Sequence, residues 1–193
     1  CRGKITEDSP TRPYHPYAAT HRAAEDMVRF YQHYKNMDTL TLRLSNGFGY
    51  PMDSGVNRWT LVFNDLCRQT MASGKMVINS SGKQQRDFIP LHDVAAAVDH
   101  FLFKISKKWD DGLFNLGGDC SFSILEVAKI IATVYEKKYG KPVPIQITGK
   151  DNGERYSPVH FNIDKLKKTG FRLTGNMEKE IEQTLSLCEK IST

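Results

Sequence analysis

Several features that would assign the chain to a specialised class of protein are missing from its sequence. The four cysteines lie far apart and form no Cys-x-x-Cys pair, at Cys1, Cys67, Cys120 and Cys188. This spacing encodes neither a zinc site nor a small disulfide framework, so we expect no metal and reduced thiols, as in the cytoplasm. No apolar run approaches the length of about 18 residues that spans a membrane, and no secretory signal opens the chain. The expectation is a cytoplasmic protein without membrane association.

Basic residues form no tail or stripe, although the net charge is +5 and the pI is near 9.0. Such a charge attracts anions in general, phosphates included, but its scattered distribution does not favour nucleic-acid binding. With 193 residues, 39% of them hydrophobic and 25% charged, the chain is long enough to fold as one globular domain or slightly more.

There is also no Gly-x-Gly-x-x-Gly or Gly-x-x-Gly-x-x-Gly loop in the chain. A loop of this kind joins a strand to a helix and places the pyrophosphate of a dinucleotide at the helix N-terminus. The main dinucleotide-binding element is therefore absent from these 193 residues. The chain begins at Cys1 rather than at a methionine, which we interpret as a sign of processing or truncation.

Helix-like and strand-like segments alternate along the chain. Helical spacing marks residues 17–35, 59–72, 93–105, 123–138, 164–169 and 178–191, and extended runs mark residues 39–44, 76–78, 86–89, 113–116 and 143–147. Residues 45–51 are dense in turn residues and predict a functional loop after a strand. Ser123 and Glu126 form a predicted capping box. The alternation indicates an α/β fold.

Two of the predicted helices carry an apolar side. In the first helix this side consists of Ala19, Ala23, Ala24, Met27, Val28, Phe30 and Tyr31. In the third helix Val94, Ala97, Val98, Phe101 and Leu102 are predicted to point inward.

Tyr17 and His21 are the first candidate functional pair. They lie four residues apart at the start of the first predicted helix, and this spacing puts two side chains on one helical face with Cβ atoms about 5–6 Å apart. A phenol and an imidazole so placed are able to work together in proton transfer. The ordinary alternative is a packed tyrosine beside a surface histidine.

The surrounding segments resemble a known family. Residues 5–10 (ITEDSP), 16–20 (PYAAT) and 22–25 (RAAE) are similar to the region around the catalytic Tyr-x-x-x-Lys of the NAD-dependent epimerase/dehydratase family, the extended short-chain dehydrogenases. His21 stands where that family usually carries lysine.

Four later stretches resemble the same family in the same order. They are RLSNGFGYP at residues 43–51, RDFIPLHDV at residues 86–94, FNLGG at residues 114–118, and Gly153-Glu154 followed by NIDK at residues 162–165. One further position departs from the pattern, because Asp151 lies where relatives often place an arginine and only Lys150 or Arg155 is near.

The resemblance implies a fold and a domain organisation. The fold would be the C-terminal part of a Rossmann-like parallel sheet together with a small α/β substrate-binding domain. Residues 1–50 would be the remnant of the dinucleotide-binding domain, and residues 51–193 mainly the substrate-binding domain. A strand and helix near residues 86–105 would return to the nucleotide domain.

The resemblance also implies residue roles. Tyr17 would take a proton from a sugar hydroxyl, with His21 as its partner, and both would bind NAD or NADP together with Leu44 and Ser45. A nucleotide-sugar substrate would be bound by Asn46, Asn57, Arg58, Val77, Asn79 and Arg86. Lysine stays protonated to about pH 10 whereas histidine ordinarily titrates near about pH 6.5, so the electrostatic help from His21 would be smaller or pH-dependent.

Two functions remain open at this point. The first is an NAD(P)-dependent sugar-nucleotide epimerase, dehydratase or reductase, whose C-terminal portion this chain would be and which would be inactive as the isolated fragment. The second is a non-catalytic nucleotide-sugar-binding or regulatory module. Single residues also have a non-functional interpretation, in which Asn46 is a turn residue and Arg86 is a surface charge. Exposed strand edges and apolar faces predict a homodimer.

Overall fold

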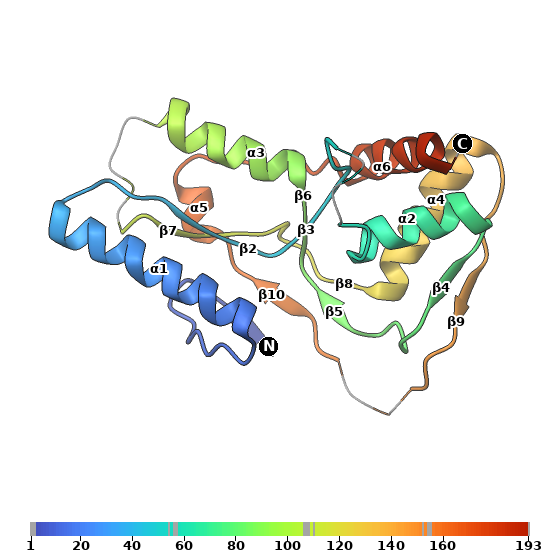
Figure 1. Ribbon diagram of the computed structural model, residues 1–193, viewed down its shortest axis with the longest axis horizontal. Coiled ribbons are helices and arrows are strands. Elements are labelled where there is room, and N and C mark those ends of the chain that lie inside the picture. Colours follow the sequence, from blue (N-terminus) through green and yellow to red (C-terminus); the bar gives the residue numbers. More distant parts are fainter. Residues whose placement is uncertain are drawn as a thin grey trace.

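The computed structural model describes residues 3–53, 55, 58–105, 109, 111–151, 153 and 156–192. Two groups of elements are visible in Figure 1, one around α1, α3 and α5 and the other around α2, α4 and α6. Each group has its own cluster of buried apolar side chains. We refer to them as the first lobe and the second lobe.

The first lobe is built on parallel strands. Strand β2 (Thr41–Leu44) pairs with β7 (Leu113–Leu116), and β1 (Gly3–Ile5) pairs with β10 (Val159–Phe161). Helix α1 (Pro16–Lys35) lies on one side of the β2–β7 pair and α3 (Leu91–Asp99) on the other (Figure 1). Helix α5 is Asp164–Lys168. The buried cluster consists of Ile89, Ala97, Phe101, Phe114, Leu116, Ile163, Leu166 and Phe171.

The second lobe contains three packed helices and two strand pairs. The helices are α2 (Val62–Ser73), α4 (Ile124–Tyr139) and α6 (Met177–Ser192). Strands β4 (Met76–Ile78) and β9 (Ile145–Ile147) pair in parallel, and β5 (Gln85–Arg86) and β8 (Phe122–Ser123) pair antiparallel. The rings of Phe48 and Phe63 stack at 3.9 Å in its core, and Phe88 meets Phe63 edge-on.

Strands β3 (Asn46–Phe48) and β6 (Phe88–Pro90) run in parallel between the two lobes (Figure 1). Successive strand residues point to opposite faces. Phe88 therefore enters the buried cluster of the second lobe, whereas Ile89 enters that of the first. The prediction that residues 45–51 form only a loop was wrong, because their backbone pairs with a segment about forty residues further along.

The predicted apolar side of α1 is not buried. No residue of Pro16–Lys35 is buried, and Met27 and Phe30 are 56% and 46% exposed. The half-covered positions are instead Arg22, Glu25, Val28 and Gln32. Helical spacing identifies a stripe of similar residues but not the surface that lies against it.

The third predicted helix also differs from the expectation. Helix α3 is followed without a break by a π-helix, η1 (His100–Lys104), whose wider turn rotates the side chains that come after it. Ala97 and Phe101 are buried as predicted, whereas Val98 and Leu102 are 39% and 57% exposed. The predicted strand at residues 86–89 is split at Asp87 into β5 and β6.

Helix α4 begins as the sequence indicates. The Ser123 hydroxyl accepts a hydrogen bond from the Glu126 backbone at 3.1 Å, and the Glu126 carboxylate accepts one from the Ser123 backbone at 2.7 Å. This reciprocal pair satisfies two amide donors at the helix start. Among the described helices, none is both long enough and apolar enough to cross a membrane.

Candidate functional site

The first candidate site residues lie at the N-terminal end of α1. The Nδ1 atom of His15 caps the helix by accepting a hydrogen bond from the Tyr17 backbone at 3.2 Å, and Pro16 occupies the first turn. The rings of Tyr17 and His21 are neighbours, with centroids 4.4 Å apart and planes inclined by 56°. Tyr17 is 69% exposed, so its hydroxyl is open to a ligand.

Leu44, Ser45 and Asn46 follow one another at the carboxyl end of β2. The Ser45 amide donates to the Leu116 carbonyl at 3.0 Å and so continues the pairing of β2 with β7. Leu44 is 51% exposed, and the buried Ser45 Oγ has no hydrogen-bond partner among the described residues. Asn46 Nδ2 donates to the carbonyl of Asp87 at 2.9 Å.

Helix α1 runs opposite to β2, so that the Tyr17 end of the helix and the Ser45 end of the strand both face the second lobe (Figure 1). In an open parallel sheet, ligands bind beyond the carboxyl ends of the strands. The two groups of predicted cofactor-binding residues therefore lie at the edge where such a ligand would be expected.

Two of the predicted substrate-binding residues in the second lobe, Val77 and Asn79, are held by hydrogen bonds. The Val77 amide donates to Gln69 Oε1 at 2.7 Å, which ties β4 to α2. Asn79 Oδ1 accepts a hydrogen bond from Thr148 Oγ1 at 3.1 Å. Arg58 is exposed just before α2. Asn57 lies outside the described residues.

Arg86 is half-covered and donates to Gln84 Oε1 at 2.9 Å. Its neighbour Gln85 lines an open cavity of about 410 Å³ together with Gly82, Lys83, Ser123, Leu125, Glu126, Lys129 and Tyr156. Because alternate strand residues point to opposite faces, the guanidinium of Arg86 points away from this cavity. None of the predicted site residues lines it.

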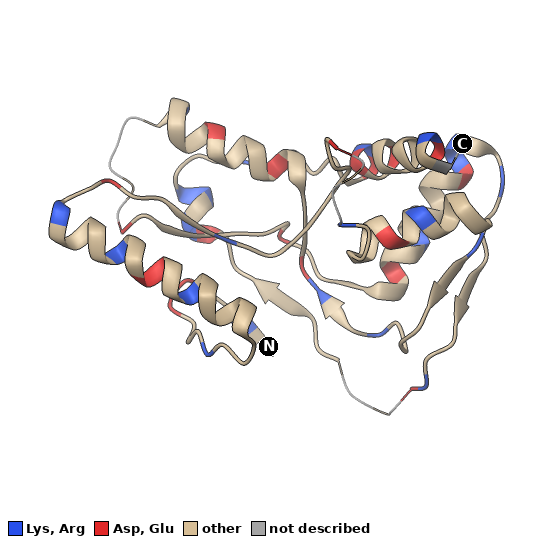
Figure 2. Cartoon of the chain, viewed as in Figure 1, with Lys and Arg blue, Asp and Glu red and all other residues tan. Residues whose placement is uncertain are grey.

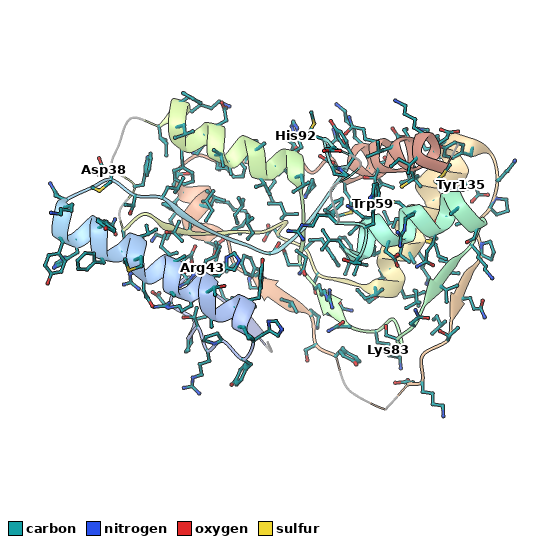
Figure 3. The ribbon with its side chains drawn as sticks, viewed as in Figure 1. Asp38, Arg43, Trp59, Lys83, His92 and Tyr135 are labelled. Carbon is teal, nitrogen blue, oxygen red and sulfur yellow. The ribbon has the colours of Figure 1, made fainter. Side chains whose placement is uncertain are left out.

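The departure at Asp151 has a structural consequence. Asp151 forms an ion pair with Lys83, and the hydrogen bond from Lys83 lowers the pKa of the Asp151 carboxyl. Lys83 is labelled in Figure 3, close to the turn between β4 and β5. Arg155, the other basic candidate at this position, lies outside the described residues.

Asp87 is a polar residue whose importance the sequence reasoning missed. It is 2% exposed, and its carboxylate accepts hydrogen bonds from the amides of Gly118 at 2.8 Å and Cys120 at 3.0 Å. Asp87 thus links the β5–β6 junction to the turn after β7. An acidic residue inside the predicted strand at residues 86–89 was the available signal.

Glu180 is a second buried acid that was missed. It is 5% exposed, and its Oε1 accepts a hydrogen bond from the His92 backbone at 3.1 Å, whereas Oε2 has no partner among the described residues. Burial raises the pKa of the Glu180 carboxyl. His92, which is labelled in Figure 3 between α3 and α6, marks this contact between the lobes.

The residues present suit one end of a nicotinamide dinucleotide. The unpartnered Ser45 Oγ and the exposed Tyr17 and His21 side chains offer polar groups to a ribose and an adjoining ring. The glycine-rich loop that would hold the pyrophosphate is not part of this sequence. Within the described part of the chain, no group of three or more histidine, cysteine, aspartate or glutamate side chains is arranged to hold a metal ion.

Residues 2–117 match the model of the NAD dependent epimerase/dehydratase family. The match covers more than half of the chain, and the chain belongs to this family.

Two curated relatives illustrate the similarity. The dTDP-glucose 4,6-dehydratase of Xanthomonas campestris pv. campestris is 27% identical over 191 residues, covering 95% of this chain and 52% of the relative. The dTDP-L-rhamnose 4-epimerase of Burkholderia thailandensis is 28% identical over 172 residues, covering 88% of this chain and 45% of the relative. The chain thus spans about half the length of the curated relatives that it matches.

The fold also matches solved structures. The UDP-glucuronic acid 4-epimerase of Bacillus cereus, in complex with UDP-glucuronic acid and NAD, superposes with a TM-score of 0.77 at 21% identity. The superposition covers 99% of this chain and 58% of that protein. The chain therefore has the Rossmann-like α/β fold of the family, as the sequence predicted.

Proposed function

We propose that the protein to which this chain belongs is an NAD(P)-dependent sugar-nucleotide epimerase or dehydratase. The observation that supports this most is the pairing of Tyr17 with His21, whose rings lie 4.4 Å apart at an open helix end. Family membership alone would not assign a role to either residue. The pairing supplies a proton acceptor with a polar partner beside it.

Tyr17 would take the proton from a sugar hydroxyl as the carbon bearing that hydroxyl is oxidised. A phenol does this well only where its ionised form is stabilised by a neighbouring positive charge or hydrogen-bond donor. His21, one helical turn away, is the described side chain whose ring contacts that of Tyr17. We therefore assign His21 the part that lysine usually plays in this family.

Tyr17, His21, Leu44 and Ser45 would hold the nicotinamide end of NAD or NADP, which supplies the hydride chemistry when it is bound. Ser45 Oγ is buried and unpartnered among the described residues, so a ligand hydroxyl or amide would satisfy it. Leu44 offers an exposed apolar surface at the strand end.

The second lobe, together with Asn46 on β3, would bind the nucleotide-sugar. The proposed contacts are Asn46, Asn57, Arg58, Val77, Asn79 and Arg86. Arg86 suits a diphosphate because a guanidinium presents a planar fork of donors. The division into a nucleotide-binding part at residues 1–50 and a mainly substrate-binding part at residues 51–193 remains a prediction.

A second candidate is a non-catalytic nucleotide-sugar-binding module, or a reductase. The observation that favours the non-catalytic alternative is the histidine at position 21, where the family usually carries lysine. Such a protein would bind the nucleotide-sugar without converting it.

The test uses the whole protein that carries this chain. We expect NAD(P)-dependent conversion of at least one member of a panel of UDP-, GDP- and dTDP-sugars, and loss of that conversion in Tyr17→Phe with substrate binding retained. Binding without conversion in the wild type would favour the non-catalytic module. If the protein bound none of these nucleotide-sugars, both proposed functions would be wrong. The 193-residue chain alone is expected to form no NADH, because it lacks the pyrophosphate-binding loop.

A further inference from the structure

The side of α1 that faces the β2–β7 pair is polar apart from Val28. Its half-covered residues are Arg22, Glu25, Val28 and Gln32, and no residue from Pro16–Lys35 belongs to either buried apolar cluster of the described chain. Interdigitated apolar side chains fix most helices on their sheets. Within the described part of the chain, directed polar contacts hold α1 instead.

Glu25 and Arg43 form the strongest of these contacts. Arg43 Nη2 donates to Glu25 Oε1 at 2.6 Å and Arg43 Nε donates to Glu25 Oε2 at 2.9 Å. The two side chains are only 10% and 19% exposed, and the hydrogen bond from Arg43 lowers the pKa of the Glu25 carboxyl. A bidentate pair of this kind fixes the relative orientation of the two side chains as well as their distance.

Further hydrogen bonds hold the pair itself in place. The remaining Arg43 nitrogen, Nη1, donates to the backbone carbonyl of Glu7 at 2.6 Å. The Glu7 carboxylate in turn accepts a hydrogen bond from the backbone amide of Asn115 at 2.9 Å. Arg43 therefore connects α1, β2 and the segment after β1, and through Glu7 it reaches β7. Figure 3 shows Arg43 between α1 and the strands.

The pair joins the two elements that carry the predicted cofactor-binding residues, α1 and β2. Glu25 follows His21 by four residues and Tyr17 by eight, so all three lie on one face of α1. Arg43 precedes Ser45 by two residues, which puts both side chains on the same face of the extended strand. One contact thus connects the helix of Tyr17 to the strand of Ser45.

We propose that Glu25 and Arg43 are positioning residues that set the spacing of Tyr17 and His21 from Leu44 and Ser45. This inference rests on the proposed function. Neither residue needs to touch the substrate or the nicotinamide. Their loss would misplace the proton acceptor while the substrate contacts of the second lobe stay intact.

The test measures kcat and KM for the whole protein with its nucleotide-sugar. Glu25→Gln removes the charge, and Arg43→Lys keeps a charge but removes the fork. We expect kcat to fall about tenfold to a hundredfold in each, as for a small misplacement of a catalytic group, with KM changed by less than about twofold.

The control is Asp26→Asn on the same helix. Among the described residues, the Asp26 carboxylate bonds Arg22, and the Asp26 side chain is 54% exposed, so kcat should stay at the wild-type value. Circular dichroism and urea unfolding check that each variant folds. Failure of both Glu25→Gln and Arg43→Lys to fold would overturn the inference, because the pair would then maintain the fold as a whole.

The outcomes separate this inference from the proposed function. If Tyr17→Phe abolishes turnover but Glu25→Gln and Arg43→Lys leave kcat unchanged, the positioning role is wrong and the enzyme assignment stands. If the wild type converts no nucleotide-sugar, or Tyr17→Phe remains active, the proposed function fails and the positioning role fails with it.

Discussion

The imidazole of His21 lies against the phenol of Tyr17, with ring centroids 4.4 Å apart and ring planes inclined by 56°. In this arrangement the two side chains are able to act on the same ligand group. A lysine at position 21 would carry a permanent charge near neutral pH, whereas a histidine gains its charge only toward acidic pH. The pH dependence of turnover should therefore report on residue 21.

The first prediction concerns His21→Lys in the whole protein. We expect this variant to keep or raise turnover at pH 7 and to widen the pH range of activity, because a permanent positive charge stabilises the phenolate. His21→Ala should lower turnover and weaken cofactor binding by about 0.5–1.5 kcal/mol, the contribution of one hydrogen bond. The measurements are pH–rate profiles and cofactor titrations of both variants.

Identical pH profiles for wild type, His21→Lys and His21→Ala would contradict this assignment. Tyr17→Phe is the reference, because it removes the proposed proton acceptor and leaves the ring in place.

Local features of the fold were predictable from the sequence. The Ser123–Glu126 capping box depends on residues three apart, and both of its hydrogen bonds are present. The adjacency of Tyr17 and His21 follows in the same way from helical spacing. The alternation of helical and strand-like spacing of apolar residues also identified the α/β class, because this spacing depends only on residues close together in the sequence.

Features that depend on distant partners were not predictable. One such feature is the covered face of α1, where Glu25 bonds Arg43, eighteen residues further along, while Phe30 on the apolar side is exposed. The contact of Glu180 with the His92 backbone spans 88 residues. A single sequence carries no signal for such pairs until the topology is known.

The second prediction concerns Gly112, which precedes β7. Its φ is +70°, and an added Cβ would lie 2.1 Å from the carbonyl oxygen of Thr39. Gly112→Ala should therefore destabilise the fold by about 3 kcal/mol or more, because a clash with backbone adds to the strain of positive φ. Urea unfolding monitored by circular dichroism would measure the loss.

Gly140 provides the matched control. Its φ is +68°, yet no atom lies within 4 Å of the position of an added Cβ. Gly140→Ala should cost only about 1 kcal/mol, the strain of the left-handed conformation. Equal losses in the two variants would show that the contact with Thr39 does not matter.

The third prediction is self-association of the 193-residue chain. Met27, Phe30, Tyr31 and Tyr34 form an exposed apolar surface on α1, and the rings of Phe30 and Tyr34 stack at 4.6 Å. Exposed surfaces of this kind tend to be covered by a partner. Light scattering at concentrations of about tens of micromolar should detect a dimer, and Phe30→Ser should shift it toward monomer. Phe103→Ser serves as control, because Phe103 is 78% exposed on η1, away from this surface. A clean monomer of the wild type would refute the prediction.

Charge should have little part in this association. Lysine, arginine, aspartate and glutamate are interspersed along α1 and over both lobes (Figure 2). The dimer should therefore persist at high salt, because interactions between exposed charges are screened whereas apolar contacts are not. Dissociation by salt would indicate a different interface.

The last prediction concerns Glu180 at the contact between α6 and the start of α3. Burial raises the pKa of its carboxyl, and Asp93 adds to the effect, whereas the backbone amides of His92 and Tyr50 and the His92 side chain oppose it. An unfolded chain releases this proton near the ordinary value of about 4.5, whereas the folded chain holds it to higher pH. The free energy of unfolding should therefore fall as pH rises from that ordinary value through the raised pKa.

Glu180→Gln should remove this decline, because an amide accepts the hydrogen bond from the His92 backbone without carrying a buried charge. We expect the variant to match the wild type near pH 4.5 and to exceed its stability at pH 7.5 by about 1–3 kcal/mol, the cost of a buried polar group that lacks a partner. Urea unfolding at both pH values gives the comparison. Glu178→Gln on the same helix is the control, since Glu178 is 53% exposed in its pair with Lys137, and exposed pairs contribute at most about 1 kcal/mol. Parallel pH profiles of wild type and Glu180→Gln would mean that the ionised carboxylate is accommodated at no cost, and that the unpartnered Oε2 is satisfied by water.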